Sequence, residues 1–120
     1  MDRKRILIFD DDAPLLDVLQ IIFLEGGYEV EVSQTCNNVI EHVNTFQPDL
    51  ILMDYQIPEI GGAEAITILR NSHKYNQVPV ILVSASTNIA KIKNTSGADD
   101  YLRKPFDIND LENIVNKYLS

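Results

Sequence analysis

Acidic side chains stand at the ends of two apolar segments of the sequence. Asp10, Asp11 and Asp12 directly follow the first of these segments, and Asp54 directly follows another. Carboxylates that are held close together repel one another unless they share a cation. Oxygen ligands of this kind suit Mg²⁺, which usually keeps several of its water molecules when a protein binds it. The sequence therefore predicts a magnesium site if the fold brings the ends of these two segments together.

Two further polar groups follow apolar segments in the C-terminal half. Ser84 and Ser86 end one such segment, and Lys104 lies between a shorter one and Pro105. A hydroxyl and an ammonium beside carboxylates can neutralise charge on a phosphoryl group. Each also has a simpler interpretation, because Ser84 could cap the segment that follows it and Lys104 could be an ordinary surface lysine.

Asp12 is best explained as a helix cap. It precedes Ala13 and Pro14, and an aspartate followed by a proline in the first helical turn is typical of a helix N-terminus. Capping accounts for one aspartate and leaves the others for the metal.

The elements that must position these residues alternate along the chain. Five short segments are predicted strands, and four amphipathic segments with apolar spacings of three and four are predicted helices. A fifth segment, Thr87–Ser96, is the weakest helix, because Asn and Thr are poor helix formers. The predicted strands lie at 6–9, 28–32, 50–53, 78–83 and 101–102, and the other helices begin near residues 14, 39, 65 and 111.

Alternating strands and helices predict an α/β fold. Parallel strands joined by right-handed crossovers give an open, doubly wound sheet with helices on both faces. The segment YEVEV at 28–32 alternates apolar and polar residues, which is typical of an edge strand with one wet face. In such sheets ligands bind beyond the carboxyl ends of the strands, where the acids, the hydroxyl and the ammonium are expected.

Composition limits the classes of protein that fit. A chain of 120 residues with 45% hydrophobic residues suits one domain, 1–120, without a linker. The net charge of -8 opposes direct binding of nucleic acid, since that binding depends on cationic side chains. Cys36 has no second cysteine to pair with, and no apolar run reaches membrane-spanning length, so a cytoplasmic location without membrane contact is expected.

Four motifs in this order resemble a known family. They are IFDDD, LILMDYQIPEIGG, VSAS and YLRKPF, each at the expected end of a strand. Together they resemble the receiver domain of bacterial two-component response regulators, of the chemotaxis-regulator kind, over essentially the whole chain. The resemblance implies a flavodoxin-like sheet of five parallel strands in the order 2-1-3-4-5 with five helices.

The resemblance also implies a magnesium-dependent phosphoacceptor site. Asp54 matches the aspartate that takes a phosphoryl group from the phosphohistidine of a histidine kinase. Asp11 matches a direct Mg²⁺ ligand, and Asp10 matches an acid that acts mainly through a metal-bound water. Gln56 matches the position whose backbone carbonyl ligates the metal.

Three residues match the parts that respond to the phosphoryl group. Lys104 matches the ammonium that contacts it, Ser84 the switch hydroxyl and Tyr101 the switch aromatic, although an aromatic residue at a strand end usually packs in the core. The Lys104-Pro105 peptide bond is a candidate for the cis form, because cis is cheap only before proline. The interval from Ser84 to Lys104 looks about two residues shorter than the usual receiver pattern, which places a change near the fourth helix.

The resemblance implies partners as well. The phosphodonor would be a histidine kinase or a phosphotransfer protein, for which the amphipathic helix starting near Pro14 offers a docking face. A downstream protein of unknown identity would recognise the phosphorylated form, and the chain itself would be a monomer or weak dimer. No output domain is expected within 1–120, and the chain is expected to be a signalling domain rather than an enzyme.

Two other classes of protein remain as alternatives. A haloacid-dehalogenase-like phosphatase also has an apolar strand that ends in an Asp-x-Asp pattern, with Asp10 as nucleophile and Asp12 as acid and base. Ser84 or Ser86 and Lys104 would then bind phosphate, but Asp54 would be unexplained. The third class is an interaction module that has lost phosphorylation, which the intact acids and lysine oppose.

Overall fold

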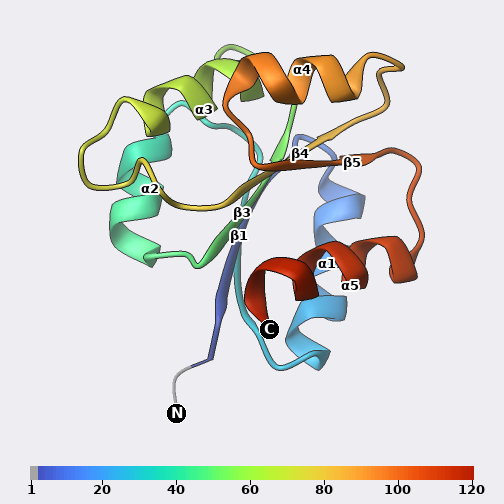
Figure 1. The fold of residues 1–120 in the computed structure, drawn as a ribbon. Coiled ribbons are helices and arrows are strands. Elements are labelled where there is room, and N and C mark those ends of the chain that lie inside the picture. Colours follow the sequence, from blue (N-terminus) through green and yellow to red (C-terminus); the bar gives the residue numbers. More distant parts are fainter. Residues whose placement is uncertain (1–2) are drawn as a thin grey trace.

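The computed structural model describes residues 3–120 and contains one central sheet with helices on both sides (Figure 1). Strands and helices alternate along the whole described chain, as the sequence predicts. In order they are β1 (Arg5–Phe9), α1 (Ala13–Glu25), β2 (Glu29–Ser33), α2 (Val39–Phe46), β3 (Leu50–Asp54), α3 (Gly62–Arg70), β4 (Val80–Ser84), α4 (Ile89–Ser96), β5 (Asp100–Arg103) and α5 (Ile108–Leu119).

The sheet has the predicted topology. Its five strands are all parallel and lie in the order β2-β1-β3-β4-β5, so the order reverses between β1 and β3. Figure 1 shows α1 and α5 on one face and α2, α3 and α4 on the other. Each face has its own apolar core, one built on Leu16, Phe23 and Leu111 and the other on Val43, Ile66 and Ile89. The fold is therefore a doubly wound three-layer α/β structure.

Burial along the strands follows their place in the sheet. Every residue of β3 and β4 is buried, which explains why their sequences are continuously apolar up to the last residue. Every residue of β2 is only half-buried, because β2 is an edge strand. The expectation of an edge strand at this position is confirmed.

Capping residues and glycines in the sequence determine where α1 begins and where α1 and α4 end. Asp12 is the N-cap of α1 and its side chain accepts a hydrogen bond from the Leu15 backbone N–H at 3.1 Å, as predicted. Gly27 follows α1 with a φ of 91°, a left-handed conformation that glycine adopts without strain. The weakest predicted helix does form, and α4 ends at Gly97, which has a φ of 90°. Within residues 3–120, no helix combines the length and apolar character needed to cross a bilayer.

Arg70 joins three segments at the edge of the sheet opposite the acidic residues. Its guanidinium donates hydrogen bonds to the backbone carbonyls of Gly97 at 2.9 Å, Asn76 at 3.1 Å and Val78 at 2.7 Å. It also pairs with the Asp99 carboxylate at 2.7 Å. The C-terminus of α3, the segment before β4 and the turn before β5 are thus held by one side chain.

We expect Arg70→Ala to destabilise the protein by about 2 kcal/mol, because it leaves several backbone carbonyls and one carboxylate without their charged donor. Urea unfolding monitored by circular dichroism measures the change. Lys91→Ala, which removes an exposed cation from α4, is the matched control and should change stability by less than about 0.5 kcal/mol. Equal effects of the two substitutions would contradict the assigned role.

Candidate functional site at the carboxyl edge of the sheet

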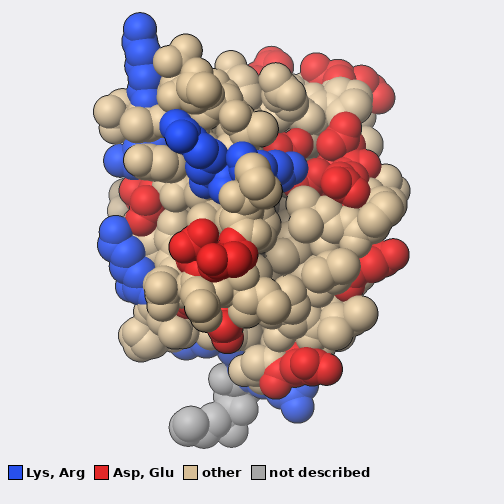
Figure 2. Space-filling model, turned by 90° about the vertical axis from the view of Figure 1, so that its right-hand side faces the viewer, with Lys and Arg blue, Asp and Glu red and all other residues tan. Residues whose placement is uncertain are grey.

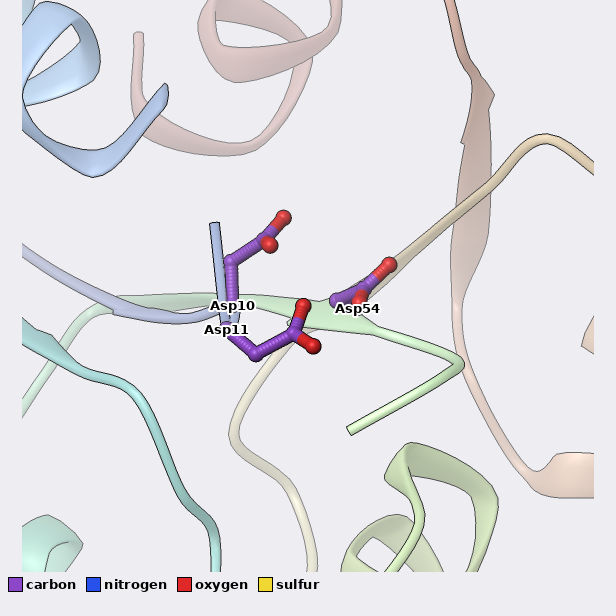
Figure 3. A group of neighbouring side chains, drawn as sticks. All are labelled: Asp10, Asp11 and Asp54. Carbon is purple, nitrogen blue, oxygen red and sulfur yellow. The ribbon is translucent and has the colours of Figure 1, made fainter. Parts of the chain in front are cut away.

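The parallel register brings the predicted acids together. Phe9 of β1 is paired with Met53 of β3, so the residues that follow them, Asp10 and Asp54, emerge side by side. Carboxylate oxygens of Asp10, Asp11 and Asp54 all lie within 4.8 Å of one another. Figure 3 shows Asp10 and Asp11 at the end of β1 beside Asp54 of β3. This position is the switch in strand order, where open α/β sheets bind ligands.

One ammonium group faces this acidic cluster. Lys104 Nζ lies 2.9 Å from the Asp10 carboxylate and 3.3 Å from that of Asp54. Asp10 and Asp54 are only 3% and 6% exposed, whereas Asp11 is exposed. Three carboxylates and one ammonium leave an excess of negative charge at a largely buried position. Such a position favours a cation or a proton.

The pKa of Asp54 reflects both the burial of the site and its excess of negative charge. Burial raises it from 3.8 to about 6, and the negative charge of Asp10 acts in the same direction. Lys104 opposes the shift without cancelling it. The pKa of Lys104 is in turn raised, because hydrogen bonding and charge from Asp10, and then from Asp54, outweigh the opposite effect of burial. The ammonium stays charged, and Asp54 keeps its proton to a higher pH than an ordinary aspartate does.

Gly62 fixes the backbone that carries Asp54. Its N–H donates to the Tyr55 carbonyl at 3.0 Å, which closes the loop that follows β3. A Cβ at this position would lie only 2.1 Å from the Asp54 carbonyl oxygen. Only glycine therefore allows α3 to start so close to the end of β3, and the approach holds Asp54 in place.

Ser84 and Lys104 arrive at the same edge from neighbouring strands. The Lys104 backbone N–H donates to the Ser84 carbonyl at 2.9 Å, and the Lys104-Pro105 bond is cis, as expected. The Ser84 side chain is buried and its hydroxyl oxygen accepts a hydrogen bond from the Ser86 N–H at 3.1 Å. This contact is a local serine turn and does not cap α4, whose N-cap is Asn88.

Tyr101 and Gln56 are not part of the acidic cluster. Tyr101 is 39% exposed and lines a groove with Ile114 and Lys117 of α5, so the packing role usual for such an aromatic does not apply here. Gln56 is exposed on the loop after β3. The acids and Lys104 form the site, and Tyr101 lies within β5, paired with Leu82 of β4.

Some contacts around the site carry no local sequence signal. The pair between Lys104 and Asp10, residues 94 positions apart, was expected only because both follow strands that end at the same edge of the sheet. The loop after β2 also reaches the site, through Gln34 and Asn37. Hydrogen bonds between residues on separate loops leave no periodicity, and only the fold identifies them.

The donor set fits a hard divalent cation. Three carboxylates from two strand ends converge from one side, and oxygen ligands of this number and kind match Mg²⁺ better than soft metals. Lys104 balances the negative charge only in part, and the excess favours binding of a cation at this position. Among the described residues, this is the group of acidic, histidine and cysteine side chains that could hold a metal.

An open parallel sheet with carboxylates and an ammonium gathered at its switch point defines the class: a doubly wound α/β protein with a polar site at the carboxyl edge. Residues 6–116 match the profile of the response regulator receiver domain. The chain belongs to this family, whose members are phosphorylated on an aspartate in two-component signalling. The match favours the receiver over the phosphatase alternative.

Curated relatives agree with this assignment. The chain is 35% identical over 116 residues to the CAI-1 autoinducer sensor kinase/phosphatase CqsS of Vibrio cholerae, covering 94% of this chain and 17% of that protein. It is 34% identical over 106 residues to the DNA-binding response regulator MtrA of Mycobacterium tuberculosis, covering 87% of this chain and 45% of that protein. The chain thus spans less than half the length of these relatives.

Solved structures agree on the fold. A putative response regulator from Chloroflexus aurantiacus superimposes with a TM-score of 0.90 at 26% sequence identity, covering 98% of both chains. The predicted family, fold class and strand order are confirmed.

The raised pKa of Asp54 leads to a test of stability against pH. Its folded value of about 6 exceeds its ordinary value of 3.8, so ionisation of Asp54 costs the native state stability as the pH rises through this interval. In the absence of metal we expect Asp54→Asn to stabilise the protein by about 1–3 kcal/mol near pH 7.5 and by little near pH 4.

Urea unfolding in the presence of a chelator, at both pH values, measures this difference. Ser86→Ala is the control, because it changes a polar residue at the same edge without removing a charge. A gain that is equal at both pH values would show that Asn acts through something other than ionisation.

Proposed function

We propose that Asp54 is the phosphoacceptor of this receiver domain. The single observation that supports this most strongly is a buried carboxylate at the switch point, with Lys104 Nζ at 3.3 Å and the carboxylates of Asp10 and Asp11 beside it. Phosphoryl transfer requires mainly positioning and neutralisation of charge, which such a cluster can supply. On this proposal the chain is a phosphorylation-controlled signalling switch and not a turnover enzyme.

We propose that Mg²⁺ is the cofactor. Asp10, Asp11, Asp54 and the backbone carbonyl of Gln56 would hold it, Asp10 mainly through a water. When bound, the cation would neutralise charge on the phosphoryl oxygens and offset the repulsion among the acids. It would also favour the ionised form of Asp54, which burial disfavours.

The residues of the chain have distinct tasks in the transfer. A carboxylate oxygen of Asp54 forms a bond to phosphorus while the bond from phosphorus to the donor's imidazole nitrogen breaks, and the electron pair stays on the imidazole. Lys104 turns from the carboxylates toward the incoming phosphoryl oxygens and stabilises their charge. Gly62 keeps the Asp54 backbone fixed during attack.

The response would pass through Ser84. A phosphoryl group on Asp54 adds roughly -1.5 to -2 charges and strong acceptor oxygens, so the Ser84 hydroxyl gains a new partner to which it can donate. Movement of Ser84 would make room for Tyr101, which is exposed in this state, to turn inward. A downstream protein that prefers this arrangement then shifts the population toward it.

We propose that the phosphodonor, a histidine kinase or phosphotransfer protein, docks on α1 beside the site. Three apolar residues of α1, Val18, Ile21 and Leu24, are between 52% and 58% exposed. An apolar groove of about 320 Å³ continues from this helix to the acidic edge. Leu15, Ala85, Lys104, Pro105 and Phe106 line the groove. A helical partner on this surface would bring its histidine to Asp54.

The surface charge supports a protein partner over direct contact with nucleic acid. Lys and Arg side chains on the face in Figure 2 lie among groups of Asp and Glu, and the net charge is -8. Binding to a phosphate backbone depends on an excess of cations. We propose a cytoplasmic domain, monomeric or weakly dimeric. A DNA-binding region of the kind named for MtrA would belong to a separate part of a longer protein.

Covalent labelling tests the phosphoacceptor. Incubation with Mg²⁺ and a small acyl phosphate should add one phosphoryl group, which peptide mass spectrometry places on Asp54. Asp54→Asn should abolish the label, and Lys104→Ala should slow labelling by on the order of 100-fold. Ser86→Ala is the matched control at the same edge and should leave the position of the label unchanged.

The phosphatase alternative predicts the opposite effects of the aspartate substitutions. It requires turnover of the acyl phosphate that Asp10→Asn stops and Asp54→Asn does not. A label on Asp10, or turnover that is unaffected by Asp54→Asn, would overturn the proposed function.

A second experiment tests the docking surface. The double substitution Val18→Glu and Ile21→Glu should slow transfer from a histidine kinase that phosphorylates the wild-type chain by roughly tenfold or more, because it places charge in an apolar interface. Labelling by acyl phosphate should change by less than about twofold, since the chemistry at Asp54 is untouched.

Lys91→Glu is the matched control, because it changes the net charge by the same two units at an exposed position of α4, on the other face of the sheet (Figure 1), and should change transfer from the kinase by less than about twofold. Equal loss of transfer from the kinase and from acyl phosphate would place the effect in the fold and exclude a docking role.

A further inference from the structure

The loop between β2 and α2, residues 34–38, touches the backbone that carries the first acidic pair. Gln34 Nε2 donates a hydrogen bond to the Asp11 backbone carbonyl at 3.3 Å. The residue before it, Ser33, accepts a hydrogen bond at its carbonyl from the Asp10 N–H at 3.1 Å. The backbone on which both acids sit is therefore held from the β2 side.

The same loop also touches the segment that follows Asp54. Asn37 Nδ2 donates to the Glu59 carboxylate at 2.9 Å, and the fully buried Cys36 thiol donates to the Ile60 carbonyl at 2.8 Å. Glu59 has a φ of 70°, a left-handed conformation that residues with a side chain rarely adopt. The contact with Asn37 helps to hold this conformation, and with it the loop that contains Gln56.

The β2–α2 loop is itself restrained. The Ser33 hydroxyl donates to the Thr35 carbonyl at 2.7 Å and accepts from the Thr35 N–H at 3.3 Å. Cys36 is anchored in the core on the α2 side. Because this segment is fixed at both ends and has internal hydrogen bonds, it can hold the loop after β1 and the loop after β3 in a fixed relative position. It bridges the loops after β1 and β3 without entering the acidic cluster.

We propose that Gln34 and Asn37 are positioning residues for the cation site. Asp11 is exposed, so packing alone does not fix its carboxylate. The hydrogen bond from Gln34 restrains the backbone of Asp11 instead. Asn37 does the same for the loop that carries the Gln56 carbonyl. Mg²⁺ demands a nearly ideal octahedral arrangement, so loosening either loop lowers its affinity. This inference rests on the proposed magnesium site.

Magnesium affinity in the absence of any phosphodonor tests the proposal. Isothermal titration calorimetry with Mg²⁺ alone should give affinities roughly two- to tenfold weaker for Gln34→Ala and for Asn37→Ala, and weaker again for the double variant. Thr35→Ala is the matched control, because Thr35 joins the hydrogen bonds of the loop through its backbone, and its affinity should equal that of the wild type.

Thermal unfolding in a chelator separates positioning from folding. A positioning role predicts a loss of affinity that exceeds any change shared with Thr35→Ala, while all variants remain folded. Unchanged affinity in the double variant, or a loss that Thr35→Ala reproduces, overturns the role of the loop and leaves the phosphoacceptor proposal standing. A wild-type chain that binds no Mg²⁺ overturns the positioning role together with the magnesium part of the proposed function.

Discussion

Electrostatic repulsion among three carboxylates is the constraint on which the site depends. Asp10, Asp11 and Asp54 have oxygens within 4.8 Å of one another, and two of these side chains are almost completely buried. Lys104 balances one charge and leaves the remainder. Such a cluster is electrostatically unfavourable unless a cation shares it, so a bound cation would change its energy strongly. A site with this property responds to small changes of charge, which is what a switch requires.

The fold tolerates the repulsion among the carboxylates because the strands that carry them are held by contacts outside the acidic cluster. β1, β3 and β4 are buried on both faces, and their register leaves their last residues side by side. Gly62 then closes the chain directly against the Asp54 carbonyl. Arg70 fixes the opposite edge through three backbone carbonyls. The apolar core thus stabilises the protein, while the acids at its carboxyl edge are free to serve binding.

Local sequence patterns predicted the strands and helices, whereas the contacts between distant segments depend on long-range packing. Apolar runs located all five strands, and Asp12 was correctly predicted as the cap of α1, because these signals act within a few residues. The family motifs, and not periodicity, predicted the strand order. The contacts of Arg70 and of Gln34 could not be predicted, since they join segments that only the folded sheet brings together. The exposure of Tyr101 likewise depends on how α5 packs beside β5, which no local pattern encodes.

On the proposed function, a charge change at Asp54 would spread through the hydrogen bonds around Ser84. The Ser84 hydroxyl accepts from the Ser86 N–H, and the Ser86 hydroxyl accepts from the Asn88 N–H, so two successive turns lead to the start of α4. Arg103 of β5 donates to the Thr87 carbonyl within the same stretch at 3.2 Å. A displacement of Ser84 therefore strains bonds that reach both α4 and β5. α4 is only eight residues long and begins without a side-chain cap, although Ile89 anchors its first turn in the core. On the proposed function, a shift of the backbone at the start of α4 would cost less than one in the buried strands.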